Sequence, residues 1–235
     1  MKGKQLLIWT ARTALLLLLF YVCFISGSMA ISGMLPDAES EPGLIEGNIG
    51  FLIFGMVNML LITVLILSSR WNGWKLALVL GTAYYGAVTF LIQIEAWYFM
   101  SNITFDQKLV PRLFIMGLPV AFIYIPLAVL ILGKWKKKSS ETPAFSLIFP
   151  VKQWILKLST IAVIYLLLYW LAGYYIAWQN AELRDFYGSP GAILPFWEQT
   201  ANTFYNEPGL FPFQAIRAML WTLCAIPIIR GSNVK

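Results

Sequence analysis

The sequence predicts an all-α polytopic membrane protein, with about six transmembrane helices arranged as three hairpins in a single domain that covers residues 1–235. Hydrophobic residues make up 59% of the chain and charged residues 12%, against about 45–50% and about 25% in soluble domains. Because each bilayer crossing needs about 20 apolar residues, this length has room for about six crossings joined by short loops. Basic residues also gather in alternate loops, as polytopic proteins require.

The first expected crossing covers residues 13–33 and follows the basic residues Lys2, Lys4 and Arg12. A basic start, a leucine-rich core and the small residues Ser28 and Ala30 also fit a cleaved signal peptide. Both interpretations of this segment stay open at the level of sequence.

The other five crossings are apolar segments long enough to span a bilayer. They are expected at about residues 49–69, 74–100, 113–132, 154–178 and 210–229. Chain ends and loops then alternate between the two sides of the membrane.

The basic residues set the expected orientation, because short cytoplasmic loops collect Lys and Arg. If the N-terminus, residues 70–75, residues 134–157 and the tail after residue 229 share one side, that side holds thirteen of the 17 basic residues and one acid, Glu141. The thirteen are Lys2, Lys4, Arg12, Arg70, Lys75, Lys134, Lys136, Lys137, Lys138, Lys152, Lys157, Arg230 and Lys235. We therefore expect cytoplasmic termini, in the plasma membrane and, given the compact loops, the inner membrane of a bacterium. This segregation explains the net charge of +6 without a nucleic-acid partner.

The long inner loop is rich in lysine. Its cations Lys134, Lys136, Lys137, Lys138 and Lys152 are expected to contact the head groups of anionic lipids. Either an ordinary anchoring loop or a specific lipid site would satisfy this pattern.

The outer loop, residues 179–209, is rich in aromatic residues. It contains Phe186, Tyr187, Phe196, Trp197, Phe204 and Tyr205. Loops of this length without structure are uncommon and often functional, so we expect a cap that folds back over the outer ends of the helices. The outer face is accordingly the expected side of function.

The chemistry that the chain lacks narrows its function. It has no histidine, and its two cysteines, Cys23 and Cys224, lie inside apolar runs. Histidine-ligated metal and haem sites and nucleophile–histidine pairs are therefore excluded, and neither a Walker-type nor a dinucleotide-binding motif occurs. We expect no metal and no cofactor, and these absences do not favour an enzymatic function.

Ionisable residues inside a membrane are costly and are usually functional or paired. Arg217 lies thirteen residues before Arg230, about 20 Å from the inner boundary at 1.5 Å per residue. Gln214 lies one turn away on the same face, and Glu95 is expected close to the outer surface. Arg217 could receive an anionic group from outside with help from Gln214, or it could form an ion pair with Glu95 or with an acid of the outer loop.

Two acids of the outer loop, Glu182 and Asp185, are further candidates. They could pair with Arg217, or act as general acid and base on a lipid-linked substrate. A solvated helix end would place the same residues one turn apart on an exposed face.

Three functions are compatible with these patterns. The favoured one is a transporter- or permease-like unit with an outward-facing site for a small anionic or lipidic substrate, since Pro119, Pro126 and Pro227 fit bent helices at such a site. The alternative is a non-catalytic partner subunit or assembly factor that binds other membrane subunits or a second copy of itself. A membrane enzyme that uses carboxylates is the third.

Overall fold

The computed structural model describes residues 2–34, 45–99, 108–136, 150–187, 189 and 191–232, and within these ranges the chain is helical with no strand. The continuous long helices are α1 (Lys2–Ser28), α2 (Gly47–Ser68), α7 (Val151–Tyr175) and α10 (Leu210–Gly231). Short helices are η1 (Met29–Ile31), η4 (Ala177–Gln179), α8 (Ala181–Phe186) and α9 (Phe196–Asn206).

Two further long helices each contain a π-helical segment. In the first, α3 (Gly73–Tyr84) continues through η2 (Tyr85–Phe90) into α4 (Leu91–Tyr98). In the second, α5 (Leu109–Met116) is followed by η3 (Val120–Tyr124) and α6 (Ile125–Ile131), with Pro119 immediately before η3. Segments of this kind widen the helix locally and occur often at functional sites.

Six helical stretches of the described chain are long and apolar enough to cross a membrane, which confirms the polytopic all-α fold class. They are Gly3–Ile31, Gly47–Ser68, Gly73–Tyr98, Leu109–Ile131, Val151–Gln179 and Leu210–Gly231. The protein is therefore an integral membrane protein.

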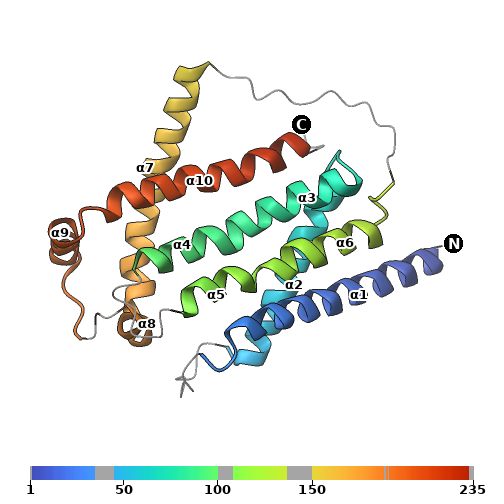
Figure 1. Ribbon diagram of the computed structural model, residues 1–235, viewed down its shortest axis with the longest axis horizontal. Coiled ribbons are helices and arrows are strands. Elements are labelled where there is room, and N and C mark those ends of the chain that lie inside the picture. The colour runs from blue at the N-terminus through green and yellow to red at the C-terminus, as the bar shows by residue number, and fades with distance from the viewer. Residues whose placement is uncertain are drawn as a thin grey trace.

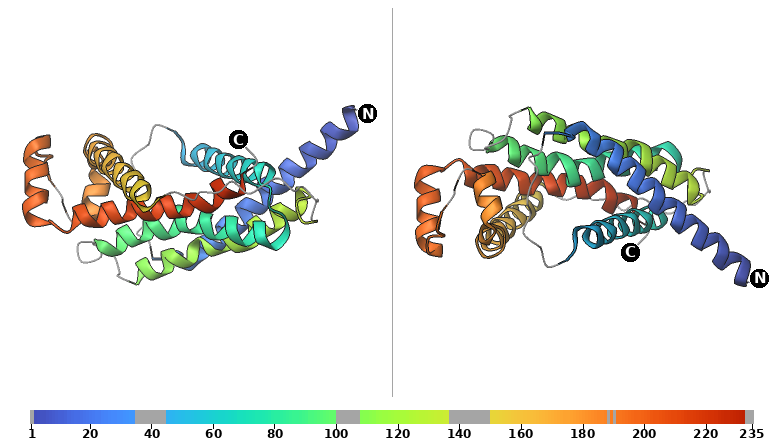
Figure 2. Two further views of the ribbon diagram at one scale, coloured as in Figure 1. Left: turned by 90° about the horizontal axis from the view of Figure 1, so that it is seen from above. Right: turned by 90° about the horizontal axis from the view of Figure 1, so that it is seen from below.

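Most of the long helices lie along one direction. In Figure 1, α1, α3 with α4, α5 with α6, and α10 run roughly side by side, and α7 crosses α10 steeply. Both views of Figure 2 place α9 at one end of the bundle and the N-terminus toward the other. The end that carries α8 and α9 is called the cap end below.

The core lies where α1, α2, α3 and the η3–α6 segment meet. Phe20 of α1 and Tyr124 of η3 are both fully buried, with their rings 5.4 Å apart in an edge-to-face contact. Ile62 of α2 and Leu80 of α3 belong to the same cluster. Because α1 supplies Phe20 to this core, the first helix is part of the packed bundle.

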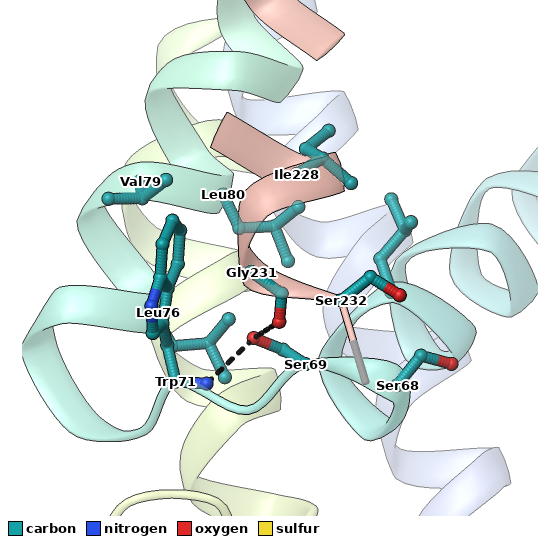
Figure 3. A pocket seen from close by; sticks show the side chains of 10 residues that line it. Ser68, Ser69, Trp71, Leu76, Val79, Leu80, Ile228, Gly231 and Ser232 are labelled. Atoms are coloured by element: carbon teal, nitrogen blue, oxygen red, sulfur yellow. Dashed lines mark hydrogen bonds between the residues drawn. The ribbon is translucent and has the colours of Figure 1, made fainter. Parts of the chain in front are cut away.

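The other end of the bundle is held by hydrogen bonds between the segment that follows α2 and the last turn of α10 (Figure 3). The N–H of Arg70 donates to the carbonyl of Gly231 at 2.8 Å, and the Ser69 hydroxyl donates to the same carbonyl at 3.3 Å. These bonds satisfy the Gly231 carbonyl, which the end of α10 leaves without a helical partner. The Lys134 ammonium group adds a 2.6 Å bond to the Ser69 carbonyl. The pocket drawn in Figure 3 has a volume of about 50 Å³, room for little more than water.

Helix α7 is the most exposed of the long helices. Ala162 is its buried residue, and its main contact is with α10. Leu167 and Leu168 are about 60% and 62% exposed, as suits side chains that face lipid tails. Together with the ends of α4 and α10, α7 lines a cavity at the cap end.

Candidate functional site: a cavity beside a buried ion pair

A buried ion pair joins α4 to α10 near the cap end. The Arg217 Nη1 and Glu95 Oε1 atoms are 2.7 Å apart, and the side chains are 4% and 19% exposed. Gln214, which is fully buried, accepts a 2.6 Å bond from Arg217 and donates a 2.8 Å bond to Glu95. Arg217 Nε also donates to the Leu91 carbonyl at 3.0 Å. The guanidinium is thus enclosed by acceptors that belong to the protein.

Helical spacing explains why these side chains meet. Gln214 and Arg217 are three residues apart on α10, and Leu91 and Glu95 are four apart on α4, so each pair shares one helix face. Phe213 of α10 also stacks on Tyr98 of α4, with ring centroids 4.3 Å apart. Ring stacking and the ion pair together fix the two helices against each other.

A cavity of about 500 Å³ lies beside this pair, at the cap end. Most of its lining comes from α7 and the cap, with α4 and α10 closing it. The lining residues are Glu95, Phe99, Tyr169, Trp170, Ala172, Gly173, Tyr174, Ile176, Ala177, Trp178, Leu183, Tyr187, Ser189, Gln199, Thr200, Thr203, Glu207 and Leu210. Glu95 therefore faces the cavity while its partner Arg217 lies behind it.

Hydrogen bonds from α7 hold the cap in place. The Trp170 indole N–H donates to the Thr200 hydroxyl of α9 at 2.8 Å, and the Tyr174 hydroxyl donates to the Leu194 carbonyl at 2.7 Å. On the other side, Phe204 of α9 contacts Phe211 of α10 with ring centroids 5.3 Å apart. The cap segment, residues 179–209, thus forms a folded wall of the cavity within the residues that the structure describes.

Charges near the cavity act on its tyrosines. The Glu95 carboxylate acts electrostatically on the hydroxyl groups of Tyr169 and Tyr187. Burial, and then the negative charge of Glu95, raise the pKa of Tyr187, against the smaller opposing effect of Arg217. Tyr187 therefore stays a neutral hydrogen-bonding group at neutral pH. Arg184 of α8 is not part of the lining, and it donates a 2.6 Å bond to the Trp178 carbonyl.

The candidate residues of the sequence fall into separate places. Arg217, Gln214 and Glu95 come together, and Arg217 forms the ion pair that was one of the two alternatives for it. Glu182 and Asp185 are exposed on α8 and are not part of the cavity lining.

Three of the five lysines expected at the lipid surface lie within the described residues. Lys134 donates to the Ser69 carbonyl, whereas Lys136 and Lys152 are exposed on either side of the undescribed segment 137–149. Lys137 and Lys138 lie outside the described residues. Lipid contact by these lysines stays a prediction.

Sequence reasoning did not select the α7 side of the cavity. Trp170, Tyr174 and Trp178 recur at every fourth position, and this spacing places them on one helix face. That polar-aromatic face could have been noticed in the sequence, but an aromatic belt near the membrane surface gives the same pattern.

The described residues contain no group of three or more cysteine, aspartate or glutamate side chains that could hold a metal ion. The sequence matches no family model, no curated protein and no solved structure. The class that fold and site together define is a helical membrane protein with a ligand-sized cavity at one end of its bundle.

Proposed function

We propose that the protein is a transporter- or permease-like unit whose cavity opens to the outer side of the membrane and binds a small, amphipathic, lipid-like substrate. The observation that carries this proposal is the cavity of about 500 Å³ beside α7. Ligand pockets are typically about 300–1,000 Å³, mostly apolar, with a few polar groups that orient the ligand. The lining here has that character, with aromatic rings, two carboxylates and several hydroxyl groups.

The outward orientation rests on charge. Arg70, Lys134 and Arg230 gather at the end of the bundle opposite the cap, where Arg70 and Lys134 contact the loop and helix end described above. Because Lys and Arg accumulate on the cytoplasmic side of polytopic proteins, the cap end faces outward. The plasma membrane, and more narrowly the bacterial inner membrane, is the proposed location.

Irregular segments within the helices support a transport cycle in which the bundle changes conformation. The π-helical segments η2 and η3 lie in adjacent helices, where Tyr85 and Phe122 contact each other at 5.9 Å between ring centroids. Pro227 lies inside α10 and removes one backbone hydrogen-bond donor there. Interrupted helices are a common feature of transporters, so the bundle contains places where it can bend.

The cavity can be tested by cysteine accessibility. In a Cys23→Ala, Cys224→Ala background, Thr203→Cys places a thiol in the cavity wall, and Asn202→Cys places one on the exposed face of the same helix. Intact cells are treated with a membrane-impermeant thiol reagent. We expect the thiols at both positions to react. Adding Gly173→Phe, which fills the cavity, should protect the thiol at position 203 and leave the one at position 202 reactive, whereas Gly173→Ala should protect neither.

The labelling pattern distinguishes a sealed cavity from a wrong orientation in the membrane. If the thiol at position 202 reacts and the thiol at position 203 does not, the cavity is sealed, and the alternative of a partner subunit or assembly factor takes precedence. If both thiols react only in inverted vesicles, the cap end faces the cytoplasm and the orientation is wrong.

A further inference from the structure

The charged residues of the cavity wall are acidic, which the sequence did not indicate. Two lining residues are acidic, Glu95 and Glu207, and the described lining contains no lysine or arginine. Arg217 would have supplied a positive charge for an anionic substrate. It lies behind Glu95, with its guanidinium bound to Glu95, Gln214 and a backbone carbonyl.

The cap segment contains one basic residue, Arg184 of α8. Arg184 donates to the Trp178 carbonyl and is not part of the lining. Glu207 is half-buried in the wall, where it follows the last turn of α9. Glu95 and Glu207 are therefore part of the wall that a ligand would contact, whereas Arg217 and Arg184 are not.

Aromatic rings make up much of the remaining wall. The six are Phe99, Tyr169, Trp170, Tyr174, Trp178 and Tyr187. Ring contacts order this set, since Tyr187 lies against both Phe99 and Trp178 at 5.4 and 6.2 Å between centroids. Aromatic faces attract cations and are the usual means of recognising quaternary ammonium groups.

We propose that the ligand of this cavity is an amphipathic cation, an ammonium group attached to an apolar body. The rings of α7 and the cap would contact the apolar body and the ammonium methyl groups, and the carboxylates would supply the opposing charge. This inference rests on the proposed function, because it names the substrate class of the same cavity.

The test uses three probes of similar size and different charge: benzyltrimethylammonium, benzyl alcohol and benzoate. Purified Thr203→Cys protein in the same Cys23→Ala, Cys224→Ala background is held in uncharged maltoside micelles. The rate at which N-ethylmaleimide modifies the thiol at position 203 is measured against probe concentration. We expect benzyltrimethylammonium to protect this thiol at the lowest concentration and benzoate to protect it least.

A matched pair of charge variants locates the effect. Glu207→Gln removes a wall carboxylate and should weaken protection by benzyltrimethylammonium about fivefold or more, the effect of one nearby unit charge. Glu198→Gln removes the same charge from an exposed position on α9 outside the lining and should change it less than twofold. Glu207→Gln is expected to fold, because a negative charge at a helix C-terminus is unfavourable.

Two outcomes would overturn the inference without touching the proposed function. Equal protection by all three probes, or stronger protection by benzoate, would show a binding cavity that does not select cations. Equal effects of the Glu207 and Glu198 variants would show that surface charge alone attracts the probe. Absence of protection by every probe overturns the inference as well, and labelling of position 203 in intact cells then decides whether the cavity itself is open.

Discussion

Replacing Glu95 with glutamine should destabilise the protein more than replacing its partner Arg217. Glu95→Gln leaves a guanidinium that is 4% exposed without its counter-charge. Breaking a buried ion pair by removing one partner costs about 3–5 kcal/mol, because the remaining charge is neither paired nor hydrated. The Gln214 oxygen and the Leu91 carbonyl remain as acceptors, so we expect the lower end, about 3 kcal/mol.

Arg217→Gln should cost less. The carboxylate left behind is 19% exposed, lines the cavity and keeps the 2.8 Å bond from Gln214. Water in the cavity can hydrate it, so the expected cost is about 1.5–2 kcal/mol, the lower part of the range for a lost hydrogen bond to a charged group. In the double variant neither charge remains, and its cost should fall below the sum of the single costs by about 1–3 kcal/mol.

The assay is equilibrium unfolding by sodium dodecyl sulfate in mixed micelles, followed by tryptophan fluorescence. The four proteins of the cycle, wild type, both single variants and the double variant, are measured under one set of conditions. If Glu95→Gln lies within about 0.5 kcal/mol of wild type, the range of ordinary surface substitutions, the buried pair does not stabilise the bundle. If Arg217→Gln lowers the free energy of unfolding more than Glu95→Gln does, the assignment of Arg217 as the buried partner and Glu95 as the more exposed one is wrong.

Two further predictions use the same unfolding assay. A Cβ at Gly81 would lie 2.5 Å from the Ala121 carbonyl oxygen, so Gly81→Ala should cost about 1–3 kcal/mol, whereas Gly50→Ala, with open space around the position, should be neutral or stabilise by up to about 1 kcal/mol. The buried Tyr124 hydroxyl has no hydrogen-bond partner in the described structure, so Tyr124→Phe should be neutral or stabilise by about 1 kcal/mol. Tyr84→Phe, which loses a 2.7 Å bond to an asparagine side chain, should cost about 1 kcal/mol; the reverse order of the two tyrosine variants would contradict this.

The bilayer crossings could be read from the sequence because they depend on local composition. The expected segment 49–69 and the observed Gly47–Ser68 differ by two residues or fewer at each end, and 210–229 corresponds to Leu210–Gly231. The length of a bilayer crossing can be read directly from its run of apolar residues, because this length does not depend on which helices the crossing packs against. Its inclination does not appear in composition, and the steep crossing of α7 over α10 (Figure 1) is set by packing between the helices.

The cap was foreseen only in outline. Aromatic composition indicated that residues 179–209 would not extend freely into solvent, but the position of α9 depends on long-range contacts. The bond from Trp170 to Thr200 joins residues 30 positions apart, and neither residue carries a sequence signal for the other. The same holds for Glu207, whose place in the cavity wall follows from how the cap folds back.

The buried pair shows most clearly why sequence alone could not fix the ligand. Depth within the membrane placed Arg217 among the costly charges and suggested an anionic substrate, and the same sequence also allowed Glu95 to neutralise it. An ion pair beside a cavity does not by itself determine whether the ligand is a cation or an anion, because that depends on which partner of the pair faces the cavity. Here the carboxylate is 19% exposed and lines the cavity, while the guanidinium is 4% exposed and lies outside the lining. That difference, which arises from how α4 and α10 turn toward each other, is what makes a cation the better complement to this site.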